Sequence, residues 1–235
     1  GAHRPVRAPG VSRALRLGAV SYLNVRPLVH GLTGPSAPEG VSLRFDVPSE
    51  CARRLAAGEI DLGMVPSITY LDRPGDRIVP GICIGSEGPV ASVALFTRRP
   101  IDEVRSIALD TSSRTSAMLT RILCARLFHI APTFVPHAPE LESMLAVADA
   151  ALLIGDPALF ADAAAHHALK IDLGGAWTLL TGLPFVWAFW SGRADAVDRD
   201  GVRTLQAAAA AGQTVTDAIA DAYCDGDGVG HRLPC

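Results

Sequence analysis

Charged residues are scarce in this chain of 235 residues: they make up 19% of it, against 49% hydrophobic residues. That balance supplies enough apolar side chains for a well-filled core in one large domain or two small ones. The formal net charge is -3, so the chain lacks the basic excess with which proteins bind nucleic-acid phosphates. Composition therefore argues against a nucleic-acid partner.

The sequence also lacks a secretion signal and a membrane-spanning run. Residues 1–16 have no apolar core of the kind that a signal peptide needs, and we expect residues 1–14 to form a disordered leader. The most apolar late stretch, residues 179–190, is broken by glycine and proline and is shorter than the ~20 residues of a membrane-spanning helix. These features predict a cytoplasmic protein without a membrane partner.

Cofactor and metal motifs are missing as well. The five cysteines include no C-x-x-C pair, which predicts free thiols in a reducing compartment rather than a zinc site. The sequence contains no P-loop, no dinucleotide-binding fingerprint and no G-x-S-x-G nucleophile elbow. We therefore expect neither a metal nor a cofactor, and no serine-hydrolase chemistry.

The chain does contain a regular alternation of strand-like and helix-like patterns. This alternation predicts an α/β fold whose parallel sheets are covered by helices, and such sheets bind ligands beyond the carboxyl ends of their strands. The glycine-rich stretch 223–235 has no periodicity and is expected to be a disordered tail. The main predicted strands are residues 15–20, 41–47, 60–65, 78–84, 90–97, 105–109, 150–154, 169–173 and 185–190, and the main helices 48–57, 113–128 and 194–222. The last helical stretch is expected to break near residue 212.

Three turns between these elements are rich in small hydroxyl or amide groups: residues 21–24, 85–92 and 110–116. The first N–H groups of a helix are free and carry the positive end of its dipole, so they suit a carboxylate or a phosphate. Each turn alone is also explained by ordinary helix capping, and so is Asp156, which follows strand 150–154. Three such turns in one chain predict a shared site for a small organic anion.

Short motifs occur along the chain, some of them in these turns: G-A-V-S-Y-L-N at 18–24, G-E-I-D-L-G at 58–63, G-P-V-A-S-V at 88–93, S-R-T-S at 113–116, A-A-L-L-I-G-D at 150–156 and T-G-L-P-F-V at 181–186. These motifs, in this order over residues 16–192, resemble the chorismate dehydratase family of the futalosine route to menaquinone. The resemblance implies a two-lobed type II periplasmic-binding-protein fold, with lobe 1 at 15–92 plus 189–222, lobe 2 at 93–188, and a hinge at strands 93–97 and 185–190.

The resemblance also implies a hydro-lyase that removes water from chorismate to give 3-[(1-carboxyvinyl)oxy]benzoate. By motif, Asn24 and Ser92 are the catalytic residues: Asn24 would hydrogen-bond developing charge or the leaving hydroxyl, and Ser92 would position the substrate or assist proton transfer. Serine is a weak base, so we expect the substrate's own enolpyruvyl carboxylate to take the proton. Arg114 either points outward or completes the anion site. The substrate-binding residues implied are Ser21, Tyr22, Ser86, Gly88, Ser113, Arg114, Thr115, Ser116 and Asp156.

Alternatives of other classes share this fold. One is a non-catalytic solute-binding protein for small anions, and another is dihydroxynaphthoate synthase of the same pathway. That synthase opens with a Ser-Pro-Cys-type motif, unlike the Ser-Tyr-Leu-Asn of residues 21–24. The family pattern fades after about residue 222, which would leave one lobe incompletely covered and keeps a homodimer open as a partner expectation.

Overall fold

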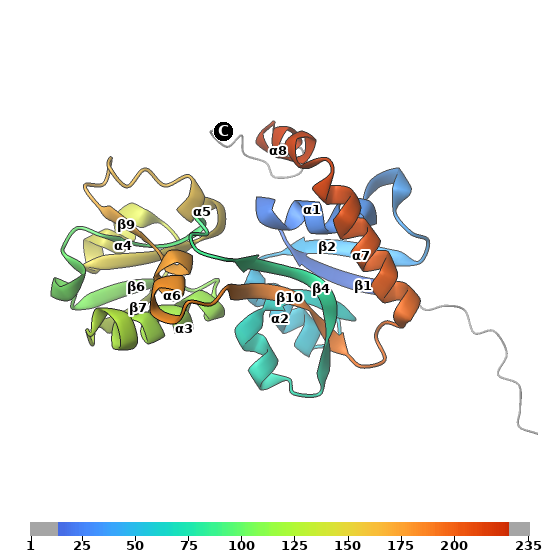
Figure 1. Cartoon of the computed structure of the whole chain (residues 1–235), viewed down its shortest axis with the longest axis horizontal. Coiled ribbons are helices and arrows are strands. Elements are labelled where there is room, and N and C mark those ends of the chain that lie inside the picture. The colour runs from blue at the N-terminus through green and yellow to red at the C-terminus, as the bar shows by residue number, and fades with distance from the viewer. Residues whose placement is uncertain (1–13, 226–235) are drawn as a thin grey trace, which may run out of the picture.

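The computed structural model describes residues 14–225 and arranges them as two α/β lobes, each built on a five-stranded sheet (Figure 1). The expected two-lobed α/β fold is therefore confirmed. The expected leader, except for residue 14, and most of the expected tail lie outside the described residues. The expectation of disorder is wrong for residues 223 and 224, because helix α8 (Thr216–Cys224) includes both and buries Tyr223.

Lobe 1 contains the sheet β2-β1-β3-β10-β4. Strand β1 pairs in parallel with β2 and β3, as expected for strands joined by helical crossovers. Helix α2 (Pro48–Ala56) packs on one face of the sheet, and α1 (Arg26–Val29) with α7 (Arg199–Gln213) packs on the other. The strands are β1 (Leu15–Val20), β2 (Val41–Asp46), β3 (Leu62–Pro66), β4 (Asp76–Ser86) and β10 (Phe185–Arg193).

Lobe 2 contains the sheet β7-β6-β8-β5-β9. Strands β5 and β8 are buried along their whole length. This burial explains the five apolar residues of β8 and the four that precede Thr97 in β5. The sequence pattern did not predict helices α4 (Leu141–Val147) and α6 (Leu173–Thr181). The other elements are β5 (Val93–Thr97), β6 (Ser106–Asp110), β7 (Thr133–His137), β8 (Ala150–Ile154), β9 (Leu169–Asp172), α3 (Arg114–Leu123) and α5 (Gly155–Leu159).

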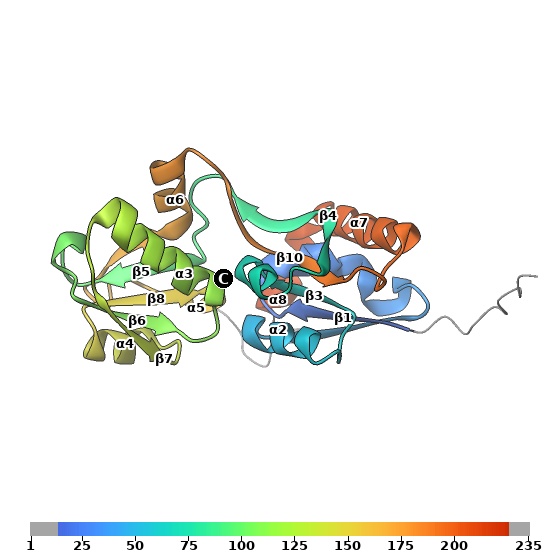
Figure 2. The same ribbon diagram turned by 90° about the horizontal axis from the view of Figure 1, so that it is seen from below.

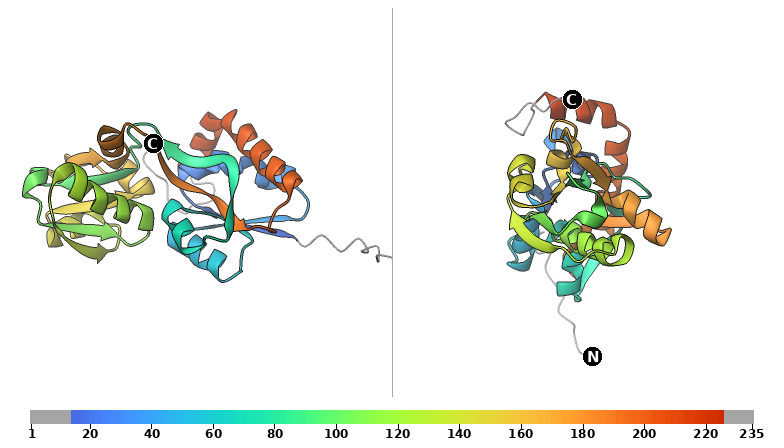
Figure 3. Two further views of the ribbon diagram at one scale, coloured as in Figure 1. Left: turned by 60° about the horizontal axis from the view of Figure 1, so that its bottom comes forward. Right: turned by 90° about the vertical axis from the view of Figure 1, so that its left-hand side faces the viewer.

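The chain crosses between the lobes twice, at residues 87–92 and 182–184 (Figure 3). The strands that follow these crossings are antiparallel to their neighbours: β5 to β8 and β9, and β10 to β3 and β4. The expectation of purely parallel sheets is wrong here, because these strands arrive from the other lobe rather than through a crossover helix on the same sheet.

The expected hinge strands are regular members of the two sheets. Strand β5 is an interior strand of lobe 2, and β10 pairs with β4 from Phe185 onward. Phe185–Ala188, expected in lobe 2, therefore belongs to the sheet of lobe 1. The connection itself is shorter than expected and consists of the two crossing segments.

The C-terminal helical stretch consists of two helices, and the expected break near residue 212 is confirmed, because α7 ends at Gln213. Helix α7 lies along lobe 1, and α8 follows it and turns toward the space between the lobes (Figure 1). Cys51, Cys83 and Cys124 are free thiols, as expected, whereas Cys224 is disulfide-bonded. Among the described helices, none combines the length and the hydropathy of a transmembrane span.

Candidate functional site

Residues of both lobes line one pocket. Figure 2 shows the carboxyl ends of β1 and β3 in lobe 1 facing those of β6 and β8 in lobe 2. No charged side chain is among the residues that line the pocket. They are Val20, Tyr22, Asn24, Pro48, Pro66, Ile84, Val90, Ser92, Val93, Ser113, Thr115, Ser116, Ile154, Gly155, Trp187 and Ala188.

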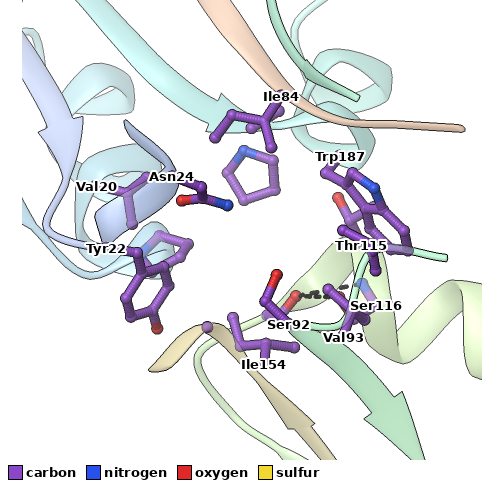
Figure 4. A pocket seen from close by; sticks show the side chains of 16 residues that line it. Val20, Tyr22, Asn24, Ile84, Ser92, Val93, Thr115, Ser116, Ile154 and Trp187 are labelled. Atoms are coloured by element: carbon purple, nitrogen blue, oxygen red, sulfur yellow. Dashed lines mark hydrogen bonds between the residues drawn. The ribbon is translucent and has the colours of Figure 1, made fainter. Parts of the chain in front are cut away.

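Asn24 and Ser92 point into this pocket from different directions (Figure 4). Asn24 belongs to the 3-10 helix η1 (Leu23–Val25) after β1, and Ser92 ends the first crossing segment. Neither side chain hydrogen-bonds another residue that the structure describes. Both polar groups are therefore available to a ligand.

The backbone that carries Ser92 is unusual. Ala91 has φ 61°, a left-handed conformation that costs a residue with a side chain about 1–2 kcal/mol. The Ser92 N–H donates to the Val90 carbonyl at 2.7 Å, and the Gly155 N–H donates to the Ser92 carbonyl at 2.7 Å. The loop before β5 is thus held in one strained shape beside the pocket.

The start of helix α3 forms one polar wall of the pocket. Ser113 is its N-cap and accepts from the Ser116 N–H at 3.2 Å, while the two hydroxyls lie 2.9 Å apart (Figure 4). The Thr115 hydroxyl accepts from the Ile68 N–H of lobe 1 at 3.3 Å. The N–H groups of Arg114 and Thr115 have no intrahelical acceptor, as in the first turn of any helix, so they can donate to an anion.

A second helix start, which the sequence reasoning missed, faces the same pocket. Pro48 is the first residue of α2 and lines the pocket, and Val47 before it provides no side-chain cap. The positive end of α2 therefore lies in lobe 1, and that of α3 in lobe 2. The sequence feature that could have predicted this helix start was the turn from strand 41–47 into helix 48–57. This turn contains no run of hydroxyl groups of the kind found in the other three turns.

Tyr22 forms part of the wall with its ring and reaches lobe 2. Its ring lies against Gly155, where an added Cβ would come within 2.8 Å of it. Burial raises the pKa of Tyr22 to about 12, and a hydrogen bond with the Ser112 hydroxyl offsets part of that rise. The phenol therefore stays protonated at neutral pH.

A buried carboxylate lies behind this contact. Asp110 is 2% exposed, and its Oδ1 accepts from the Ser112 N–H at 2.8 Å and from the Ser112 hydroxyl at 2.6 Å. Its Oδ2 has no hydrogen-bond partner of normal geometry. Burial raises the pKa of Asp110, and the bonds from Ser112 lower it only in part.

Five of the expected site residues do not line the pocket. Two of them support its wall: the Ser86 hydroxyl accepts from Trp187 Nε1 at 3.1 Å, and the Gly88 N–H donates to the Thr178 hydroxyl at 3.0 Å. Arg114 adopts the outward alternative, because its guanidinium pairs with Asp72 at 2.7 Å.

The remaining two, Ser21 and Asp156, lie at a contact between the lobes. The Tyr223 hydroxyl donates to the Asp156 carboxylate and reaches the Ser21 carbonyl at 3.4 Å. The Asp156 side chain is therefore directed at α8 and not at the pocket.

The apolar wall of the pocket is the part that the sequence reasoning mostly missed. Trp187 is buried in the core and also lines the pocket beside Ile84. Its neighbours in the sequence gave no reason to distinguish the two roles. The described residues contain no group of three His, Cys, Asp or Glu side chains that could hold a metal ion.

Comparison with known proteins identifies the family. The sequence model of the menaquinone biosynthesis family matches residues 15–229. The chorismate dehydratase of Thermus thermophilus is 34% identical over 193 residues, which cover 75% of this chain and 69% of that protein.

Solved structures agree with the fold. Protein AF1704 from Archaeoglobus fulgidus superposes with a TM-score of 0.67 at 14% identity, over 92% of this chain and 83% of that one. The periplasmic aliphatic sulphonate binding protein SsuA from Escherichia coli gives a TM-score of 0.61 at 18% identity, over 92% and 77%. These likenesses confirm the periplasmic-binding-protein type of fold, and the sequence match shows that the chain belongs to the menaquinone biosynthesis family.

Proposed function

We propose that this chain is a chorismate dehydratase, a hydro-lyase that converts chorismate into 3-[(1-carboxyvinyl)oxy]benzoate and water. The observation that carries the proposal is the uncharged pocket between two helix starts of opposite lobes, with the free Asn24 and Ser92 side chains between them. Chorismate has two carboxylates, and the starts of α2 and α3 offer N–H donors to each. The chain also belongs to a family that includes a named chorismate dehydratase.

The elimination removes a hydroxyl from one ring carbon and a proton from the adjacent ring carbon, which bears the enolpyruvyl ether. The electrons of the broken C–H bond enter the ring, which becomes aromatic as the C–O bond to the hydroxyl breaks. The reaction is strongly downhill. The protein has only to orient the substrate and stabilise the charge that develops on the way.

No lining side chain is suited to take the proton. The pocket has no charged residue, and Tyr22 holds its own proton because its pKa is raised to about 12. A hydroxyl such as that of Ser92 is a weak base without a neighbouring base to activate it. The enolpyruvyl carboxylate of the substrate is therefore the proton acceptor in this proposal.

Asn24 and Ser92 have complementary roles. The Asn24 amide would donate a hydrogen bond to the leaving hydroxyl or to the ring carboxylate as it gains enolate character. Ser92 would hold the substrate so that its enolpyruvyl carboxylate lies beside the C–H bond. A preorganised donor of this kind is typically worth about 10²–10³ in rate.

Incubation with chorismate tests the proposal directly, by the ultraviolet absorbance and the mass of the aromatic product. We expect turnover by the wild-type protein and a loss of about 10²-fold or more in Asn24→Ala and in Ser92→Ala. Near-full turnover in both folded variants would refute the assigned roles. Binding of chorismate without turnover would instead favour the solute-binding alternative.

The proposal also includes a pathway and a cellular compartment. We assign the reaction to the futalosine route, on the motifs at residues 18–24 and 88–93, and to the cytoplasm, where a biosynthetic enzyme of this family would act. A homodimer stays a prediction.

A further inference from the structure

The strained loop before Ser92 is held by a carboxylate that does not line the pocket. One oxygen of Asp172 accepts from the Val90 N–H at 3.0 Å, and the other accepts from Val90 at 3.0 Å and from the Ala91 N–H at 2.6 Å. Ala91 is the residue with φ 61°. The carboxylate therefore binds the loop at its least favourable point, one residue before Ser92.

Asp172 is itself rigidly placed. It is the last residue of β9, paired across the sheet with Ala94 of β5, and it is the N-cap of α6 through the Gly175 N–H at 2.9 Å. Helix α6 packs directly on the loop, since a Cβ added to Gly174 would come within 2.5 Å of the Gly88 carbonyl oxygen. The support behind the loop thus includes a sheet and a helix.

Capping alone does not account for this arrangement. An N-cap side chain needs one oxygen for one or two N–H groups of its own helix, whereas the second oxygen of Asp172 is used only on the crossing segment. We propose that Asp172 is a positioning residue: its carboxylate holds Val90 and Ala91 so that the Ser92 hydroxyl faces the pocket. The inference rests on the proposed function in one respect, that Ser92 acts on the substrate.

The substitution Asp172→Asn separates the two roles. Asparagine caps helices about as well as aspartate, but its amide group would place a second donor opposite the Ala91 N–H. Asp198→Asn is the matched control, because Asp198 caps α7 through the Gly201 N–H at 2.9 Å and does not line the pocket. We expect Asp172→Asn to lower kcat by up to about 10²-fold, the typical effect of misplacing a reacting group. KM should change little, and Asp198→Asn should match the wild type.

Ala91→Gly provides a rescue experiment. Glycine adopts a positive φ without the steric penalty of alanine, so Asp172→Asn combined with Ala91→Gly should recover part of the lost kcat. A chemical role for the carboxylate in proton transfer would not be rescued in this way. Recovery of kcat in the double variant therefore supports the positioning role of Asp172. No recovery of kcat, together with unchanged exchange of the loop amides, overturns that role.

Amide hydrogen exchange gives a readout that does not depend on turnover. The Ala91 amide should exchange faster in Asp172→Asn than in the wild type or in Asp198→Asn. If the wild type fails to convert chorismate, the proposed function is wrong while the exchange result still decides the role of Asp172. If the wild type converts chorismate and Asp172→Asn does so equally well, the positioning role is wrong and the proposed function stands.

Discussion

The Tyr223 hydroxyl donates a hydrogen bond to the Asp156 carboxylate, and this bond joins helix α8 of lobe 1 to helix α5 of lobe 2. Tyr223 is only 5% exposed. Burial and the bond to Asp156 raise its pKa, so it remains a protonated donor at neutral pH. Asp156, expected to bind substrate, instead connects the two lobes beside the pocket.

Removing that hydroxyl should loosen the contact between the lobes. We expect Tyr223→Phe to lower the free energy of unfolding by about 1.5–3 kcal/mol, the usual range for a bond to a charged acceptor, and to raise KM for chorismate. Tyr70→Phe is the control, because the Tyr70 hydroxyl makes no hydrogen bond to any residue that the structure describes. Urea denaturation and steady-state kinetics measure the two effects, and equal behaviour of both variants would contradict the role of Tyr223.

Gly155 is restricted both by its backbone and by the Tyr22 ring. Its φ is +62°, and an added Cβ would come within 2.8 Å of that ring. Gly40 has φ +77° and open space around it, so Gly40→Ala should cost only the ~1–2 kcal/mol of a left-handed alanine. Gly155→Ala should cost a further ~1–3 kcal/mol from overpacking and should weaken chorismate binding. Similar thermal unfolding midpoints for the two variants would show that the contact with Tyr22 is unimportant.

Arg114 should be dispensable for the reaction. Its side chain is 51% exposed, and the side chain of its partner Asp72 is 56% exposed. Exposed ion pairs of this kind contribute less than about 1 kcal/mol to stability. We expect Arg114→Ala to keep kcat and KM close to the wild-type values, whereas Ser113→Ala should raise KM. A large increase in KM for Arg114→Ala would mean that the guanidinium reaches the substrate after all.

Asp110 should make stability depend on pH. Because its folded pKa is raised, the ionised form is less favourable in the folded protein than in the unfolded chain. Its contribution to stability therefore falls as the pH rises from the unfolded pKa through the folded one. The free energy of unfolding of Asp110→Asn, relative to the wild type, should be higher at about pH 7 than at about pH 4. Urea titrations at both values test this, with the exposed Asp102→Asn as the control, and a difference independent of pH would contradict it.

Local patterns predicted much of the fold, because the buried face of a helix or strand requires apolar residues at a regular spacing. Strand β8 is buried on both faces and reads as five consecutive apolar residues, and α3 has an apolar stripe and a serine cap. Helix α6 escaped prediction, since its glycines at 174 and 175 are poor helix formers. Gly174 is explained only by the close approach of α6 to the Gly88 carbonyl.

The sequence by itself determined the two-lobed α/β fold, the family, and the turns that supply polar groups, among them Asn24, Ser92 and Ser113. Only the tertiary structure decided which of those groups share the pocket and which form contacts elsewhere. Ser86 and Gly88 support the wall, Arg114 pairs with Asp72, and Asp156 holds Tyr223. The physical reason is that a turn's composition is local, whereas the partner of each group comes from the opposite lobe or from an element many residues away in the chain.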